Sequence, residues 1–321
     1  MISSVLVPLD GSPEAEQAIP YAQAVLPSGG NVLLFTAVSD LGTPMAGDPE
    51  LTGWQRTPNP GQEAAYATEL NAARAALQQI VAQRPDSPAN WTVEVALGDP
   101  ATQILQTIAQ RGADLVAMTT HGRGTLGRFV FGSVADRIVR TSPVPVLLVR
   151  PALTAATEGS VLARLLVPLD GSERAEAALP VAKGLAQRLA VPIQLVRATN
   201  SAQVLATLGG SGPFPATPPA DIYDRLGNDL ENEATTYLSG VAKDLRAEGI
   251  DARWEVGLGS PYAEIANAIK PGDLLVMTSH GRGGVMRWLL GSVAEKLVRE
   301  APAPVLLVPA ANRGTAAAAE G

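Results

Sequence analysis

Residues 113–124 read ADLVAMTTHGRG, and residues 272–283 read GDLLVMTSHGRG. In each stretch an apolar run ends in a polar segment that contains several glycines. A short, nearly continuous apolar run is typical of a strand that is buried on both faces of a parallel sheet. Glycines after such a strand let the backbone approach a ligand with no side chain in the way. The chain therefore contains, twice, a buried strand that leads into a candidate binding loop.

The similarity between the two halves of the chain extends outward from these stretches. VPLDGS at residues 7–12 recurs at residues 167–172, and PVLLV at residues 145–149 recurs at residues 304–308. The repeated unit is as long as a domain, so it indicates a tandem duplication and not a solenoid. We predict domains at residues 1–150 and 164–310, a linker at residues 151–163 and a disordered Ala/Gly-rich tail at residues 311–321.

Strand-like and helix-like segments alternate along each copy, and Pro20 and Pro180 should kink the first helix of each. This alternation predicts a parallel sheet with helices on both faces. We therefore predict an α/β fold of two tandem doubly wound five-stranded parallel-sheet domains, Rossmann-like in architecture. No element is predicted over residues 39–60 and 199–220. The predicted strands of the first copy are residues 4–9, 31–37, 91–97, 113–119 and 145–149, and its helices include residues 13–26, 62–83 and 100–110.

The composition of the chain excludes several classes of function. Its 321 residues carry a net charge of −7, with 4% aromatic residues and no cysteine. A nucleic-acid surface would need a basic stripe or aromatic stacking platforms, and a thiolate metal site would need cysteine. No apolar run reaches the length of a membrane span, and no secretory leader is visible. We expect a cytoplasmic protein that binds neither nucleic acid nor membrane.

The glycine-rich loop has two features suited to a phosphate group. Gly122 permits close approach of the backbone, and Gly132 with Ser133 opens a helix whose free N–H groups and positive dipole end favour an anion. A structural alternative is that Ser133 and Asp136 form a capping box that only stabilises this helix. Recurrence of the intact loop after a buried strand favours phosphate binding. The matching residues of the second copy are Gly281, Gly291, Ser292 and Glu295.

Three further residue types in or near the loop have both a functional and a structural interpretation. Arg123 and Arg128 fit phosphate neutralisation or solvent-exposed loop positions, and the sequence leaves both open. His121 lacks the partners of a catalytic triad or a metal site, which favours a hydrogen bond that shapes the loop. Asp10 can contact a ligand or form the Asp-Gly turn common after a strand. Their counterparts are Arg282, Arg287, His280 and Asp170.

Together these motifs resemble a universal stress protein domain over nearly the whole length of each copy. The signature of the ATP-binding members is Gly-x2-Gly-x9-Gly-Ser/Thr, and both copies match it except that Thr119 and Thr278 replace the first glycine. The resemblance implies an adenine nucleotide alpha hydrolase-like fold and ATP as the cofactor, which Mg²⁺ can accompany. It also implies adenosine near Asp10, adenine at the main chain around Ala37, and phosphates at the glycine loop.

The cofactor-binding residues predicted for the first copy are Pro8, Asp10, Ala37, Gly122, Arg123, Gly132, Ser133 and Val134. Those predicted for the second copy are Pro168, Asp170, Ala198, Gly281, Arg282, Gly291, Ser292 and Val293.

The sequence and the resemblance favour a nucleotide-binding stress response protein that regulates and does not catalyse. A weak ATPase is the enzymatic alternative, although the chain has no Gly-x4-Gly-Lys-Ser/Thr motif. A nucleotide-free dimerisation scaffold is the third interpretation, and Thr119 and Thr278 are its best support. In the family, two domains pair through their last strands. The resemblance therefore implies an intramolecular pseudo-dimer through residues 143–149 and 302–308, and it leaves room for a further homodimer.

Overall fold

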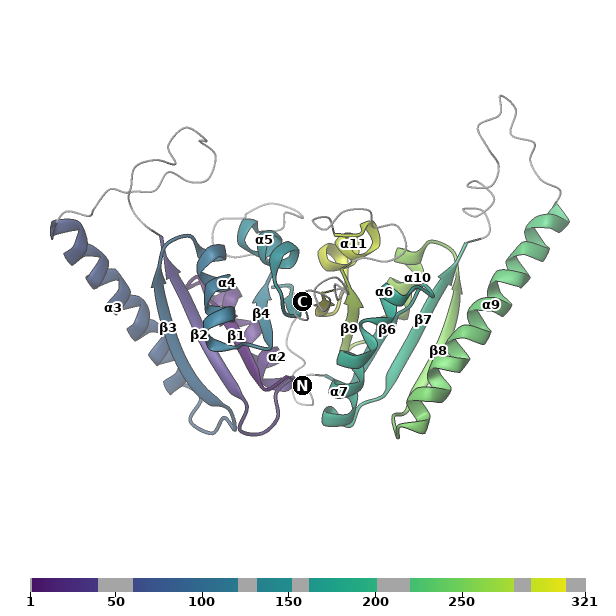
Figure 1. Cartoon of the computed structure of the whole chain (residues 1–321), viewed down its shortest axis with the longest axis horizontal. Coiled ribbons are helices and arrows are strands. Elements are labelled where there is room, and N and C mark those ends of the chain that lie inside the picture. The colour runs from purple at the N-terminus through teal and green to yellow at the C-terminus, as the bar shows by residue number, and fades with distance from the viewer. Residues whose placement is uncertain are drawn as a thin grey trace, which may run out of the picture. The chain divides into compact units, whose positions relative to one another are not determined.

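The computed structural model describes residues 2–39, 60–120, 132–151, 162–200, 220–279 and 290–309 (Figure 1). The chain divides into two compact units, Met1–Pro151 and Ala152–Gly321. Most of the predicted linker and the whole predicted tail lie outside the described residues. So do residues 40–59 and 201–219, for which the sequence predicts no element.

The first unit is a parallel five-stranded sheet in the order β3-β2-β1-β4-β5. From β1 the chain moves outward through β2 to β3, then returns to β4 on the other side of β1 and continues to β5. This reversal of winding is the predicted doubly wound arrangement, which is confirmed. Its elements are β1 (Ser4–Pro8), α1 (Pro13–Glu16), α2 (Ala18–Ala24), β2 (Asn31–Val38), α3 (Pro60–Ala82), β3 (Asn90–Leu97), α4 (Pro100–Arg111), β4 (Leu115–Thr119), α5 (Ser133–Thr141) and β5 (Val146–Val149).

The second unit repeats this topology in the order β8-β7-β6-β9-β10. Figure 1 shows the same succession of strands and helices in the two units, with α9 in the place of α3. The elements are β6 (Arg164–Pro168), α6 (Glu173–Glu176), α7 (Leu179–Leu189), β7 (Ile193–Thr199), α9 (Ala220–Ala247), β8 (Ala252–Leu258), α10 (Pro261–Ala268), β9 (Asp273–Thr278), α11 (Ser292–Glu300) and β10 (Val305–Val308).

The central strands form the core of each unit because helices cover them on both faces. In the first unit α2 packs on β1, β4 and β5, while α3 packs on β2 and β3 and α4 packs on β2. All five residues of β4 and the three middle residues of β1 are buried. Burial on both faces explains why the strand at residues 115–119 is an apolar run and not an alternating pattern.

The first helix of each unit is broken where the sequence predicts a kink. α1 ends at Glu16, four residues before Pro20, and α6 ends at Glu176, four residues before Pro180. Proline has no N–H for the carbonyl four residues earlier, and its ring clashes with that carbonyl. The predicted kink is therefore confirmed, and it takes the form of two consecutive helices, the first of which has only four residues in each unit.

Candidate functional site

A cavity of about 250 Å³ opens in the first unit at the carboxyl ends of β1 and β4. The winding of the sheet reverses between these two strands, and open α/β sheets bind ligands at such a point. The cavity brings together every described residue that the sequence predicts for the first site. These residues are Pro8, Asp10, Ala37, Gly132, Ser133 and Val134.

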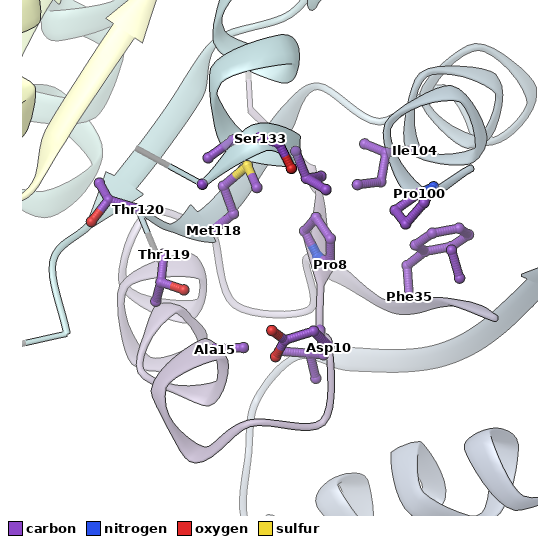
Figure 2. A pocket seen from close by; sticks show the side chains of 15 residues that line it. Pro8, Asp10, Ala15, Phe35, Pro100, Ile104, Met118, Thr119, Thr120 and Ser133 are labelled. Carbon is purple, nitrogen blue, oxygen red and sulfur yellow. The ribbon is translucent and has the colours of Figure 1, made fainter. Parts of the chain in front are cut away.

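The cavity has an apolar side and a polar side. Phe35, Pro100 and Ile104 lie together on one side, and Thr119 and Ser133 lie across the space from them (Figure 2). The apolar residues come from β2 and from the first turns of α4, whereas the polar ones come from the end of β4 and the start of α5. This arrangement can hold a ligand that is flat and apolar at one end and anionic at the other.

Sequence reasoning missed the apolar side of the cavity, formed by Phe35, Pro100 and Ile104, and it also missed Met118 of β4. Two residue spacings in the sequence indicate this apolar side, once Ala37 is taken as a site residue. Phe35 lies two residues before Ala37 on the same strand, so both side chains lie on one face. Pro100 and Ile104 are four residues apart on one helix and therefore share a face.

Asp10 forms the turn after β1 and also lines the cavity. Its Oδ1 accepts hydrogen bonds from the Ser12 N–H (3.0 Å) and the Ser12 hydroxyl (2.5 Å), while Gly11 has φ +78°. The Ser12 hydroxyl in turn accepts from the Ala15 N–H at 3.2 Å and caps α1. Figure 2 shows the Asp10 carboxylate turned toward Ala15 and Thr119. The turn and the ligand-facing position predicted as alternatives are thus both compatible with the structure.

Among the described residues no side chain caps the start of α5, so the capping box considered as the structural alternative is wrong. Gly132 is the N-cap residue, no side-chain hydrogen bond caps the helix, and Ser133 is the first helical residue. The Asp136 carboxylate accepts instead from Arg140, at 2.9 Å from Nε and 2.8 Å from Nη2. In α11, Gly291 is likewise the N-cap, and Glu295 pairs with Arg299 at 2.6 Å. The first N–H groups of α5 therefore face the cavity with no competing cap from a side chain.

Thr119, at the position where the resemblance implies the first glycine of the signature, is the last residue of β4. It pairs in register with Val149 and is 7% exposed. A β-branched residue suits this extended conformation, so threonine continues the strand by one residue without strain. The next residue, Thr120, accepts the Gly132 N–H on its carbonyl at 3.0 Å and joins the strand to the start of α5.

The two helices that flank the cavity are held together by an ion pair. Arg137 of α5 donates to Asp99 Oδ2 (2.7 Å) and to Thr102 Oγ1 (3.1 Å), and Asp99 caps α4. Burial alone would raise the pKa of Asp99. Hydrogen bonds from Thr102 and the charge of Arg137 outweigh that effect and hold the pKa below its ordinary value. This contact links α5 to the start of α4, and because both side chains are about half exposed it contributes about 0–1 kcal/mol.

The second unit repeats the local geometry of the first. The Asp170 carboxylate accepts from the Ser172 N–H (2.9 Å) and hydroxyl (2.6 Å), and the Gly291 N–H donates to the Ser279 carbonyl at 2.9 Å. Pro168 and Ala198 lie near the ends of β6 and β7, and Ser292 and Val293 begin α11. The described residues predicted for the second site thus occupy the positions whose counterparts line the cavity in the first.

Several predicted loop residues lie outside the described residues. They are Gly122, Arg123, Arg128, His121, Gly281, Arg282, Arg287 and His280. Within the described ranges, no three His, Cys, Asp or Glu side chains gather as a metal site would require. Over the same ranges, no helix has the length and apolar character needed to cross a membrane.

Comparison with known proteins assigns both units to one family. The model of the Universal stress protein family matches residues 1–150 and 162–309. Universal stress protein Rv2005c of Mycobacterium tuberculosis is 26% identical over 307 residues, which cover 94% of this chain and 96% of that protein. Universal stress protein MJ0577 of Methanocaldococcus jannaschii is 27% identical over 157 residues, which cover 46% of this chain and 96% of that protein.

The fold is also shared with a solved structure over the full chain. The crystal structure of a universal stress protein from Archaeoglobus fulgidus matches with a TM-score of 0.63 and 20% identity, covering 96% of this chain and 99% of that one. With both units matched by the same family model, this chain belongs to the Universal stress protein family as a member with two tandem domains.

Proposed function

We propose that this protein is a nucleotide-binding stress response protein, with ATP as the ligand of the first unit and a nucleotide site of the same construction in the second. The observation that carries the proposal is that one cavity joins an apolar wall to a helix start that no described side chain caps. A purine base buries apolar surface, and its phosphates carry the negative charge that a helix N-terminus favours.

In this proposal each side of the cavity has a separate task. Phe35, Pro100 and Ile104 pack against the base, and the main chain at Ala37 meets its edge. The N–H groups at the start of α5 and the Ser133 hydroxyl donate to phosphate oxygens, which Mg²⁺ can accompany. Such a ligand crosslinks β2 and α4 to α5, so binding would stabilise the unit and could signal nucleotide level to other proteins.

We propose a regulatory role and not an enzymatic one, in a cytoplasmic protein. The sequence has no P-loop motif to position the phosphates and Mg²⁺ for hydrolysis. The cytoplasmic location is inferred from the cysteine-free sequence.

The proposal is tested by placing a negative charge where the phosphates would lie. The double variant Ser133→Asp with Ser292→Asp puts a carboxylate at the first residue of α5 and of α11. There it interacts favourably with the positive end of the helix dipole but repels a phosphate. Ser133→Asn with Ser292→Asn is the matched control of the same size without the charge. We expect calorimetric titration with ATP to show at least a tenfold (~1.4 kcal/mol) weaker affinity for the Asp chain than for the Asn chain.

Thermal unfolding of both variants checks that each chain remains folded. Equal ATP affinity of the Asp and Asn chains, or no ATP binding by the wild type, would refute the proposal. Phosphate release above background that the Asp pair abolishes would instead identify a weak ATPase.

A further inference from the structure

The second site differs from the first at the end where the base would lie. Ala37 pairs in register with Ala96 in the first unit, and Ala198 pairs with Gly257 in the second. Two residues earlier, Phe35 of the first unit corresponds to Val196 of the second. Paired residues, and residues two apart on a strand, share one face of the sheet. The second unit therefore has smaller side chains at two adjacent positions on the face that lines the cavity in the first unit.

The side chain of Glu264, from the first turns of α10, lies over the position of Gly257. A Cβ added to Gly257 would be 2.6 Å from both Glu264 Cβ and Glu264 Oε2, and one added to Gly259 would be 2.7 Å from Oε1. Real Cβ atoms do not approach other atoms so closely, so Gly257 is required for this side chain to lie against the strand, whereas at Gly259 the close contact is with the movable carboxylate end. Gly257 thus admits a carboxylate next to Ala198.

The first unit has a neutral residue at the corresponding place. Gln103 lies over Gly98, with Nε2 3.1 Å from where a Cβ would be, and Ala96 occupies the strand position that Gly257 takes in the second unit. The difference between the two sites is therefore one of charge as well as of size.

The Glu264 carboxylate is a hydrogen-bond acceptor at the edge of the second site. Across the described part of the chain it makes no hydrogen bond or ion pair, and the residue is only partly exposed. Its helix neighbours Pro261 and Ile265 correspond to Pro100 and Ile104, which Figure 2 shows on the apolar wall of the first site. A glutamate in a first helical turn also favours the helix dipole, but that effect alone does not require Gly257 beneath it.

We propose that the second site selects a guanine-type base, with adjacent N–H donors on its edge, over adenine. This rests on the proposed function, since it assumes that the second site binds a nucleotide. A carboxylate accepts two neighbouring N–H groups in charge-assisted hydrogen bonds, and guanine presents such a pair at N1 and N2. At the positions of these two N–H groups adenine has the N1 lone pair and a C2–H, so its N6 amino group could pair with only one carboxylate oxygen while the other would face the lone pair. The first site lacks this carboxylate and accepts adenine.

The test uses the full chain with one site disabled at a time. Ser133→Asp disables the first site, so only the second can bind a nucleotide. Ser292→Asp disables the second site, so only the first can bind one. In calorimetric titrations, we expect the Ser133→Asp chain to bind GTP at least tenfold more tightly than ATP, and the Ser292→Asp chain to prefer ATP. Adding Glu264→Gln to the Ser133→Asp chain should weaken GTP binding about tenfold and should not weaken ATP binding. Glu231→Gln, on the exposed surface of α9, removes the same charge and should leave both affinities unchanged.

The failure of this inference can be told apart from failure of the proposed function. An unchanged GTP-to-ATP ratio in Glu264→Gln, or an ATP preference of the Ser133→Asp chain, overturns the base selection alone. No nucleotide binding by either single-site chain overturns both proposals. If Glu264→Gln does not fold, Ala96→Gly with Gln103→Glu in the Ser292→Asp chain makes the reciprocal test. This transfer should move the first site toward GTP, and an unchanged ATP preference overturns the inference.

Discussion

At the scale of single residues, the contact between Gly257 and Glu264 has a direct consequence for stability. Gly257→Ala places a methyl group 2.6 Å from Glu264 Cβ, so either α10 or β8 must shift. We expect a loss of about 1–3 kcal/mol in the free energy of unfolding, as for other overpacked positions. Denaturant unfolding of the variant and the wild type measures this loss.

Gly240→Ala is the matched control. Gly240 lies on the exposed side of α9, with nothing within 4 Å of an added Cβ. Alanine there should raise the stability by up to about 1 kcal/mol because it is a better helix former. An equal change in stability of the two variants would mean that Glu264 does not lie against the strand, and base selection by its carboxylate would then have no structural basis.

Single residues also show what the sequence could predict about the site. Asp10 and Gly132 were predicted because turns and helix starts have strong local signals, and both lie at the cavity. Phe35 and Ile104 could not be told from core residues, because an apolar residue that lines a cavity has the same periodicity as one that fills the core. The predicted cap failed because Gly132 and Ser133 both suit the N-cap, and Arg140 competes for Asp136.

At the scale of elements, Asp114 joins the start of β1 to the start of β4. Its Oδ2 accepts from the Ser3 N–H (2.8 Å), the Ser3 hydroxyl (2.8 Å) and the Ser4 N–H (3.0 Å). Burial alone would raise the pKa of Asp114, but these hydrogen bonds outweigh it and the pKa is lowered. Because the folded pKa is depressed, this stabilisation is present above the ordinary aspartate pKa of about 3.9 and is lost as the pH falls through the folded value.

We therefore expect Asp114→Asn to be less stable than the wild type at pH 7, by about 1 kcal/mol. The difference should narrow below about pH 4, where the wild-type carboxylate is itself protonated. Urea unfolding across this pH range measures it, with Asp244→Asn on the exposed side of α9 as the control. A difference that stays constant with pH would contradict this account of the strand junction.

The same junction in the second unit is an ion pair between β6 and β9. Arg164 donates to Asp273 through Nε (2.8 Å) and Nη2 (2.6 Å), and the Asp273 side chain is 1% exposed. Arg164→Met leaves a buried carboxylate without its cation, so we expect a loss of about 3–5 kcal/mol in the free energy of unfolding.

Arg253→Met provides the control for this change. Arg253 pairs with Asp251 at 3.1 Å, and both side chains are more than half exposed. Such a pair contributes about 0–1 kcal/mol. Denaturant unfolding measures the loss of stability in both variants. Similar losses would show that the buried Arg164 pair contributes no more to the free energy of unfolding than the exposed Arg253 pair does.

The order of elements was predictable because apolar runs and helical spacing are local signals. The residues at which elements begin and end were less predictable. The sequence predicts one kinked helix over residues 13–26, whereas the structure has α1 and α2 with a break at Gln17. The position of Glu264 could not be predicted, since it depends on the register that sets Gly257 beside Ala198.

At the scale of the whole molecule, the duplication predicts that the two units form a pair within one chain. The family resemblance implies that the domains pair through residues 143–149 and 302–308, which contain β5 and β10. We expect small-angle scattering and NMR relaxation of the full chain to report one compact particle with a single tumbling time. Two independent tumbling times would contradict the pseudo-dimer without affecting the nucleotide sites.

Native mass spectrometry of the full chain in equal concentrations of ATP and GTP tests whether each unit holds a nucleotide. It also tests whether the two units hold different nucleotides, as the base selection requires. We predict a dominant species with one ATP and one GTP per chain. Two ATP molecules per chain would contradict the base selection alone, whereas a chain that stays bare at every nucleotide concentration would contradict nucleotide binding itself.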